Sequence, residues 1–236
     1  MSTASGFGKA LVIITGASRG FGRALALSVA ARVSPGSVLV LAARSEEQLL
    51  ELKSALTRGE TGLTTKEKGM SKPQFSASLG DVSRYCRDFT NMEELNSYLS
   101  LNVSSALCLT AGVLRTYPKR SGLTRVIVNI SSLCALRPFP TWVQYCSGKA
   151  ARDMMFRVLA EEEPELRVLN YAPGPLDTDM QREARSICAH SELRNTFSQM
   201  HANGQLLTCD QSIQKLMSVL LEDKYSSGEH LDYYDL

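Results

Sequence analysis

The sequence has little net charge, no closely spaced cysteine pair and no apolar leader. Its formal net charge of +2 over 236 residues gives no case for nucleic acid or an anionic membrane as a partner. Six scattered cysteines without a CxxC pair argue against disulfides or a zinc site and favour free thiols in a reducing compartment. No apolar run approaches about 18 residues, and the opening MSTASGFGKA has no apolar signal core. We therefore expect a cytoplasmic protein.

Apolar strands and amphipathic helices alternate along the chain, which indicates an α/β fold. The length fits one large domain with a sizeable core, and 44% hydrophobic and 21% charged residues are ordinary for a globular protein. Short continuous apolar runs are typical of buried parallel strands. The expected strands are 10–14, 37–44, 125–132, 166–174 and 228–236, and the expected helices include 45–56, 91–115, 145–160 and 211–221.

Residues 57–80 break this alternation. They are polar and contain no run of four apolar residues, although a Rossmann-type sheet calls for another strand and helix here and then a central strand beside the first. We predict a single domain over 1–236 whose doubly wound parallel sheet lacks part of the region between its third and fourth strands. In this prediction residues 57–80 form an irregular, truncated, flexible loop. Residues 181–208 are polar and helix-prone, either a flap over a substrate or a solvated helical excursion.

A glycine-rich turn, TGASRGFG at 15–22, stands between the first strand and an apolar-periodic helix. Glycines let the backbone turn tightly and approach a pyrophosphate, and the helix N-terminus offers unpaired N–H groups to the phosphates. This context predicts a dinucleotide site, and a glycine loop that only packs is the alternative.

Arg44 ends the second strand, where an NAD-binding unit carries an acidic residue for the ribose hydroxyls. A guanidinium at this place suits the 2′-phosphate of NADP, and Arg19 in the glycine turn can supply a second cation. For each arginine the alternative is a solvated surface charge.

Tyr145 and Lys149 are four residues apart on a predicted helix and so share one face. A lysine ammonium one turn from a phenol stabilises the phenolate, which lowers the phenol's pKa and makes the tyrosine a usable proton donor. Ser132, at the end of the preceding strand, could hold a substrate carbonyl oxygen. Asn102 lies on an apolar helix and needs partners, because an unpaired buried amide costs about 1–3 kcal/mol. By itself the Tyr-Lys spacing also fits an ordinary amphipathic pair.

The segments TGASRGFG, NISS, YCSGK and APGPLDTDM together resemble the short-chain dehydrogenase/reductase family. The resemblance covers nearly the whole chain apart from residues 60–77 and extends to pterin-reducing members of the family. It implies a doubly wound Rossmann sheet, a homodimer, NADPH as cofactor, and reduction of pterin side-chain carbonyls in tetrahydrobiopterin biosynthesis.

The resemblance also implies a role for each matching residue. Ser132 orients the carbonyl, Tyr145 donates the proton, Lys149 lowers the tyrosine pKa and binds the nicotinamide ribose, and Asn102 holds a water of the proton relay. The implied contacts of NADP, besides Tyr145 and Lys149, are Gly16, Ser18, Arg19, Gly20, Phe21, Gly22, Ala43, Arg44, Leu176, Thr178, Asp179, Met180 and Gln181. The implied pterin contacts are Ser132, Tyr145, Gly174 and Asp232. A carboxylate such as Asp232 can accept two N–H bonds from an amino-pyrimidine edge, and an exposed tail charge is the alternative.

Two family features are absent: the Asp-Leu/Val pair after the third strand and the NNAG stretch that ends the fourth. Only residues 77–83 resemble the family's sequence, at the positions just after NNAG. Loss of a central strand leaves backbone groups of its neighbours unpaired, at about 1–3 kcal/mol for each one that is buried. Two alternatives to a pterin reductase therefore stay open, namely a broad-specificity carbonyl reductase and a catalytically impaired, truncated isoform.

Overall fold

The computed structural model of the chain describes residues 6–57, 62, 64–69 and 78–236. Strands and helices alternate, and all paired strands are parallel. The predicted α/β fold class of Rossmann type is therefore confirmed. The chain forms two compact units, Met1–Ser76 with Cys209–Asp223 and Ala77–Thr208 with Lys224–Leu236.

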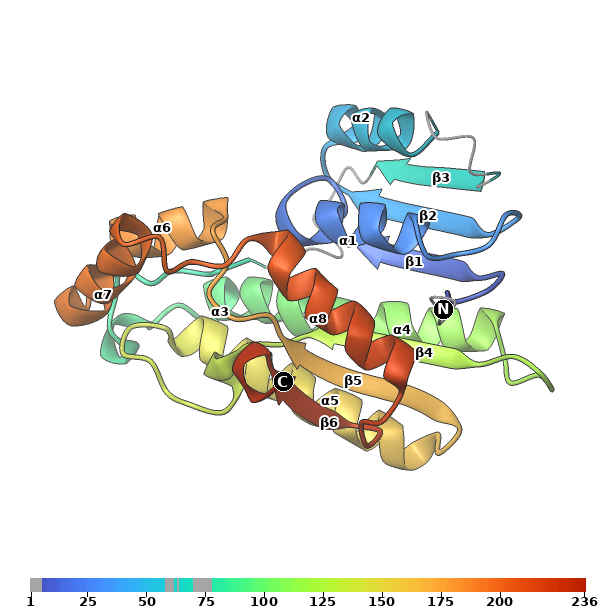
Figure 1. Ribbon diagram of the computed structural model, residues 1–236. Coiled ribbons are helices and arrows are strands. Elements are labelled where there is room, and N and C mark those ends of the chain that lie inside the picture. The colour runs from blue at the N-terminus through green and yellow to red at the C-terminus, as the bar shows by residue number, and fades with distance from the viewer. Residues whose placement is uncertain (1–5, 58–61, 63, 70–77) are drawn as a thin grey trace. The chain divides into compact units, whose positions relative to one another are not determined.

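The first unit contains a parallel sheet in the order β1-β2-β3. The leucines of the second helix recur at helical spacing and meet those of the second strand in one buried cluster, which includes Leu39, Leu41, Leu49 and Leu52. The elements of this unit are β1 (Leu11–Thr15), α1 (Gly20–Ala30), β2 (Val38–Ala43), α2 (Glu46–Thr57), β3 (Thr64–Gly69) and α8 (Cys209–Glu222), shown in Figure 1.

Strand β3 corrects the prediction that residues 57–80 form a loop. It pairs with β2, from Thr64 opposite Val38 to Gly69 opposite Ala43. Its sequence, TTKEKG, is too polar to show as an apolar run. An edge strand needs backbone pairing on one side only, and lysines are common on such strands. The rest of that stretch, apart from Gly62 and residues 78–80, lies outside the described residues.

The second unit contains a parallel sheet in the order β4-β5-β6. The middle strand is buried almost throughout, and the long helix α5 packs on it and on its neighbour β4. The elements of this unit are α3 (Met92–Leu99), α4 (Ser105–Thr116), β4 (Arg125–Ile130), α5 (Val143–Glu162), β5 (Leu166–Ala172), α6 (Asp179–Ile187), α7 (Ser191–Ala202) and β6 (Glu229–Asp232). The predicted strands and helices are confirmed here with small shifts at their ends.

The described strands thus form two three-stranded sheets and not one continuous sheet. Residues 78–91 contain one 3-10 turn, Cys86–Asp88, and neither a strand nor an α-helix. This agrees with the predicted shortening between the third and fourth strands of the family, because the strand expected at the centre of the sheet is the one without a counterpart in the described residues.

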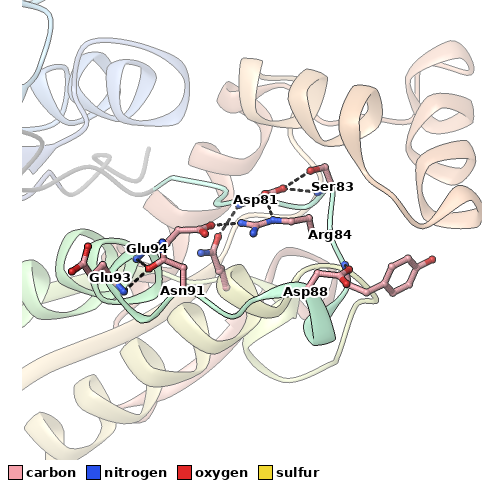
Figure 2. Close-up of polar contacts among 9 residues, drawn as sticks. Asp81, Ser83, Arg84, Asp88, Asn91, Glu93 and Glu94 are labelled. Atoms are coloured by element: carbon pink, nitrogen blue, oxygen red, sulfur yellow. Dashed lines mark hydrogen bonds and ion pairs between the residues drawn. The ribbon is translucent and has the colours of Figure 1, made fainter.

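Polar contacts fix residues 81–91 to the start of α3 (Figure 2). Arg84 donates to Asp81 at 2.6 Å and also to Glu94 of α3. Asn91 caps the helix, because its Oδ1 accepts from the backbone N–H groups of Glu93 and Glu94 at 2.9 and 3.3 Å. Ion pairs and a helix cap therefore help to hold the segment that follows the shortened region.

Helices α3 and α4 are joined by a π-helical segment, Ser100–Ser104, so the predicted helix over 91–115 is confirmed as one helix, Met92–Thr116. By length and composition it is the one helix among the described residues that could cross a membrane, and 11% of its apolar window is buried. This result is compatible with the expectation that no continuous apolar run approaches about 18 residues. Scattered serines and Asn102 interrupt the apolar run without making the helix polar overall.

Candidate active site

Tyr145, Ser132 and Lys149 meet where β4 ends and α5 begins. The Ser132 hydroxyl interacts with the Tyr145 phenol and favours its ionised form. Lys149 Nζ donates to the carbonyl oxygen of Ile130 at 2.7 Å and lies 5.4 Å from the centre of the Tyr145 ring. Tyr145 is 9% exposed and Lys149 is 7% exposed. The three residues predicted from sequence are therefore brought together in one buried group.

Burial dominates the protonation of this group. It raises the pKa of the Tyr145 phenol, and the hydrogen bond with Ser132 opposes that rise without cancelling it. Burial, followed by the nearby Arg152 guanidinium, lowers the pKa of Lys149 to about 7. Burial thus outweighs any effect of Lys149 on the Tyr145 phenol, because a desolvated lysine that is partly neutral near pH 7 stabilises a phenolate weakly. That Lys149 lowers the Tyr145 pKa stays a prediction.

Asn102 lies in the π-helical segment and is 4% exposed. Its Nδ2 donates to the carbonyl oxygen of Tyr98 at 2.9 Å and to Ser78 Oγ at 3.3 Å, and its Oδ1 accepts from the Ser78 N–H at 2.7 Å. The buried amide therefore has the partners that its sequence context requires. Tyr98 in turn lies against Gly148 of α5, where an added Cβ would be 3.1 Å from the ring. These contacts tie Asn102 to the helix of the candidate proton donor.

A buried aromatic cluster covers Tyr145. The Trp142 ring meets the Tyr145 ring edge-on with 5.5 Å between centres, and Phe197 of α7 lies 5.5 Å from Trp142. Leu79 and Val82, which follow the shortened region, belong to the same cluster. Residues 181–208 therefore form two helices, α6 and α7, that pack on the cluster, so they are not merely a solvated excursion. Their role as a flap stays a prediction.

Gly174 and Asp232 lie at the ends of the neighbouring strands β5 and β6, which pair Ala172 with Asp232. Gly174 has φ +76°, and an added Cβ would lie 2.8 Å from a methyl carbon of Leu207 and 3.3 Å from Cβ of Tyr233. Glycine is therefore required there by both space and conformation. The Asp232 side chain accepts from the Tyr234 N–H, through Oδ1 at 3.0 Å, and from the backbone N–H of Asp235. A carboxylate has about four lone-pair sites, so this side chain can also accept from a ligand.

Backbone and side-chain contacts hold the segment after β5. Leu176 forms a bridge with Leu207, and Thr178 Oγ1 caps α6 by accepting from the Gln181 N–H at 3.4 Å. Gln181 Nε2 donates to the carbonyl oxygen of Phe197 at 3.3 Å, so its side chain binds α7. The two remaining predicted contacts of this segment occupy the first turn of α6: Asp179 and Met180.

The glycine turn lies in the first unit, between β1 and α1. Gly16 and Gly20 have φ +67° and +52°, and an added Cβ at Gly22 would lie 2.3 Å from the carbonyl oxygen of Gly16. Arg19, beside the start of α1, and Arg44, just past β2, are exposed at the carboxyl ends of two paired strands. The same strand ends carry the other predicted contacts: Ser18, Phe21 and Ala43.

The predicted residues therefore fall into two groups, with the phosphate-binding candidates in the first unit and the catalytic and pterin candidates in the second. Sequence reasoning missed a buried polar cluster in the second unit. Its members come from three strands and α5 or follow them directly: Asn129, Ser131, Asp153, Asn170 and His230. Two signals were present in the sequence, a carboxylate four residues after Lys149 and a histidine two residues before Asp232.

The family model and the curated relatives agree on one family, and a solved structure shares the fold. The model of the short chain dehydrogenase family matches residues 76–188. The chain is 45% identical to sepiapterin reductase of Bos taurus over 98% of its length and 96% of that protein, and 44% identical to sepiapterin reductase of Xenopus tropicalis over the whole of both. The crystal structure of the KRED1-Pglu enzyme superposes with a TM-score of 0.79 at 24% identity, covering 94% of this chain and all of that one. The bovine alignment extends over 257 residues against 236 here, so the relative contains residues without a counterpart in this sequence.

Proposed function

This chain belongs to the short chain dehydrogenase family of oxidoreductases, and from its likeness to sepiapterin reductases we propose that it uses NADPH to reduce ketones in pterin side chains. The proposed substrates are sepiapterin and 6-pyruvoyl-tetrahydropterin, in tetrahydrobiopterin biosynthesis. The observation that carries the proposal is the grouping of three side chains, with Ser132 interacting with the Tyr145 phenol and Lys149 one turn further along α5. Such a group can hold a carbonyl oxygen and give it a proton.

In the proposed reaction NADPH, when bound, supplies the hydride. The Ser132 hydroxyl donates a hydrogen bond to the substrate carbonyl oxygen and orients it, while the Tyr145 phenol gives that oxygen a proton. Lys149 also binds the nicotinamide ribose. With a pKa of about 7 it can return a proton to Tyr145 near neutral pH, because proton transfer is most efficient when the pKa is close to the operating pH. Asn102, whose amide is held by Ser78 and Tyr98, would place a water in this relay.

The glycine turn fits a dinucleotide. An added Cβ at Gly22 would collide with the Gly16 carbonyl oxygen, so glycine lets the start of α1 pack closely on the end of β1, as in dinucleotide-binding turns. Exposed Arg19 and Arg44 supply cations for phosphate, and the Arg44 guanidinium suits the 2′-phosphate that distinguishes NADP from NAD. The further proposed contacts of the cofactor are Ser18, Gly20, Phe21, Ala43, Tyr145, Leu176, Thr178, Asp179, Met180 and Gln181.

Asp232 and Gly174 would bind the pterin. The Asp232 carboxylate caps the C-terminal turn and keeps lone pairs with which it can accept from the amino-pyrimidine edge. Gly174 has a positive φ, with Leu207 and Tyr233 packed closely against it, and its backbone would contact the flat ring.

We also propose a homodimer in the cytoplasm. Met154 and Val158, four residues apart on α5, are 56% and 47% exposed, and Leu107 of α4 is 52% exposed. Exposed apolar side chains that are neighbours on one helix face, as Met154 and Val158 are, can form a patch that binds a partner. All six cysteines are free, which suits a reducing compartment. Sedimentation of the wild type and of Val158→Glu tests the dimer, which the substitution should dissociate.

Isotope transfer tests the proposed reaction. NADPH deuterated at the transferable position of nicotinamide C4 is incubated with the protein and sepiapterin, and the product is analysed by mass spectrometry. The proposal predicts one deuterium at the former ketone carbon. A folded protein that binds NADPH and yields no labelled product contradicts it.

Two other candidate functions are separated by simple assays. In a broad-specificity carbonyl reductase, Asp232→Ala would change the reduction of sepiapterin and of a small diketone to the same extent. In a pterin reductase, the variant would lose mainly the activity on sepiapterin. The split into two sheets and the shorter sequence favour an impaired isoform. A melting temperature that rises with NADPH argues against that isoform, because a ligand stabilises the state that binds it.

A further inference from the structure

A cluster of buried polar side chains joins helix α5 to the strands β4, β5 and β6. Asp153 of α5 is 5% exposed, and the side chain of His230 on β6 is 6% exposed. Asn129, Ser131 and Asn170 are each 1% exposed or less. Polar groups this deeply buried are costly unless they bind one another.

Asp153 is the centre of the cluster. Its Oδ1 accepts from Ser131 Oγ at 2.5 Å and from Asn129 Nδ2 at 3.1 Å, and its Oδ2 lies 2.5 Å from His230 Nδ1. Asn170 adds a further link, since it accepts from Asn129 at 2.9 Å and donates to the backbone of Gly228 at 3.1 Å. Three donors thus satisfy a carboxylate that could not otherwise be buried in its charged form.

The arrangement is not that of a nucleophilic triad. In such triads a histidine bridges the serine and the carboxylate, so that it can take the serine proton. Here the carboxylate of Asp153 bridges Ser131 and His230. Within the described part of the chain Ser131 has no hydrogen bond to a histidine; it donates to Asp153 instead, and these contacts serve to hold elements together.

His230 uses one of its two ring nitrogens. Nδ1 faces Asp153, whereas Nε2 is buried without a hydrogen-bond partner among the described residues. An unpaired nitrogen in this place is unfavourable. The imidazole therefore contributes through the Nδ1 contact alone.

The elements joined by this contact carry the two halves of the proposed substrate site. Asp153 is one helical turn beyond Lys149 on the helix that also carries Tyr145. His230 and Asp232 are two residues apart on β6, so their side chains leave the same face of the strand. The contact between residues 153 and 230 spans 77 positions in sequence.

We propose that Asp153 and His230 are positioning residues that set where Asp232 holds a pterin relative to the proton donor Tyr145. This inference rests on the proposed function. Neither residue touches the substrate. Without the contact, β6 keeps its backbone pairing with β5, but Asp232 loses its fixed place relative to α5. Pterin binding should then suffer, while a small ketone held only by Ser132 and Tyr145 should not.

The test compares two variants. His230→Phe removes the N–H that faces Asp153. His230→Asn restores an N–H at the same place, because Asn Nδ2 and His Nδ1 are each two bonds from Cβ. The matched control is His201→Phe at an exposed histidine of α7. Pterin affinity is measured with sepiapterin by calorimetry, NADPH affinity by fluorescence, and KM and kcat with sepiapterin and with a small diketone.

We expect His230→Phe to weaken sepiapterin binding about tenfold or more, the usual effect of losing a hydrogen bond to a buried charge. NADPH affinity and the diketone kinetics should stay within about twofold, and His230→Asn should recover most of the loss. Should His230→Phe fail to fold, Asp153→Asn takes its place with the same expected pattern.

Equal losses for sepiapterin, diketone and NADPH would show a merely structural role and overturn the inference, as would unchanged sepiapterin binding in His230→Phe. A wild type that binds sepiapterin without reducing it overturns the proposed function alone, because the binding comparison still decides the role of His230. A wild type that binds no sepiapterin overturns both.

Discussion

Replacement of Lys149 by methionine should change how the stability of this protein depends on pH. Lys149 is 7% exposed, and burial lowers its pKa to about 7 from the ordinary 10.5. Between these two pH values the unfolded chain binds a proton that the folded chain has released. The free energy of unfolding of the wild type should therefore rise with pH in this interval, with a contribution from Lys149 of about 1.4 kcal/mol per pH unit.

The magnitude of the Lys149→Met effect is set by the same interval. Below pH 7 both states carry the charge, and burying it costs at most about 5 kcal/mol, an upper bound that relaxation of the site reduces. Methionine has a similar length and no charge, so the variant avoids this cost. It loses the 2.7 Å hydrogen bond to the Ile130 carbonyl, which is worth about 1 kcal/mol. Lys149→Met should therefore be more stable than the wild type at pH 6, and the difference should vanish near pH 10.

Urea unfolding at fixed protein concentration between pH 6 and pH 10 measures this effect. Lys9→Met, at an exposed lysine, is the control and should leave the pH dependence unchanged. A Lys149→Met variant with the same pH dependence as the wild type would refute the reasoning, because Lys149 would then keep an ordinary pKa in the folded state.

Three further predictions concern the cofactor turn and a reactive thiol. Gly22→Ala places a Cβ 2.3 Å from the Gly16 carbonyl oxygen and should weaken NADPH binding about tenfold or more in a fluorescence titration. The control is Gly112→Ala, whose Cβ meets nothing within 4 Å and which should leave NADPH binding unchanged. Equal NADPH affinities of the two variants would contradict the role of the turn. Arg44→Ala should weaken NADPH binding about tenfold while leaving NADH binding unchanged, and parallel losses would disprove 2′-phosphate recognition. A hydrogen bond with Cys134 lowers the pKa of Cys146 to about 7. The rate of Cys146 alkylation, followed by peptide mass analysis, should therefore have its midpoint near pH 7, and Cys134→Ala should shift this midpoint to higher pH. An unchanged midpoint in Cys134→Ala would rule out this cause.

Local sequence patterns located the strands, the glycine turn and the Tyr145–Lys149 pair, because each depends on spacing within a few residues. Strand β3 was not legible, since an edge strand is specified by pairing with β2 and not by its own apolar content. The absence of the NNAG stretch correctly indicated that the sheet lacks a central strand among the described residues.

The properties that sequence could not give depend on tertiary structure. The direction of the Tyr145 and Lys149 pKa shifts is set by burial, which the four-residue spacing does not reveal. The Asp153–His230 contact joins residues 77 positions apart, so no local sequence pattern predicts it. The packing of α6 and α7 on Trp142 likewise depends on contacts across the fold, because residues 181–208 are mostly polar in sequence.

The central claim is that Tyr145 gives a proton to a pterin ketone. The most direct test is the rate of NADPH consumption with sepiapterin, measured by absorbance for the wild type and for Tyr145→Phe, with NADPH affinity and thermal stability determined for both. We predict turnover by the wild type and a loss of about 100-fold or more in kcat for Tyr145→Phe at unchanged NADPH affinity. Equal rates for the two proteins, or no turnover by a folded wild type that binds NADPH, would contradict the claim.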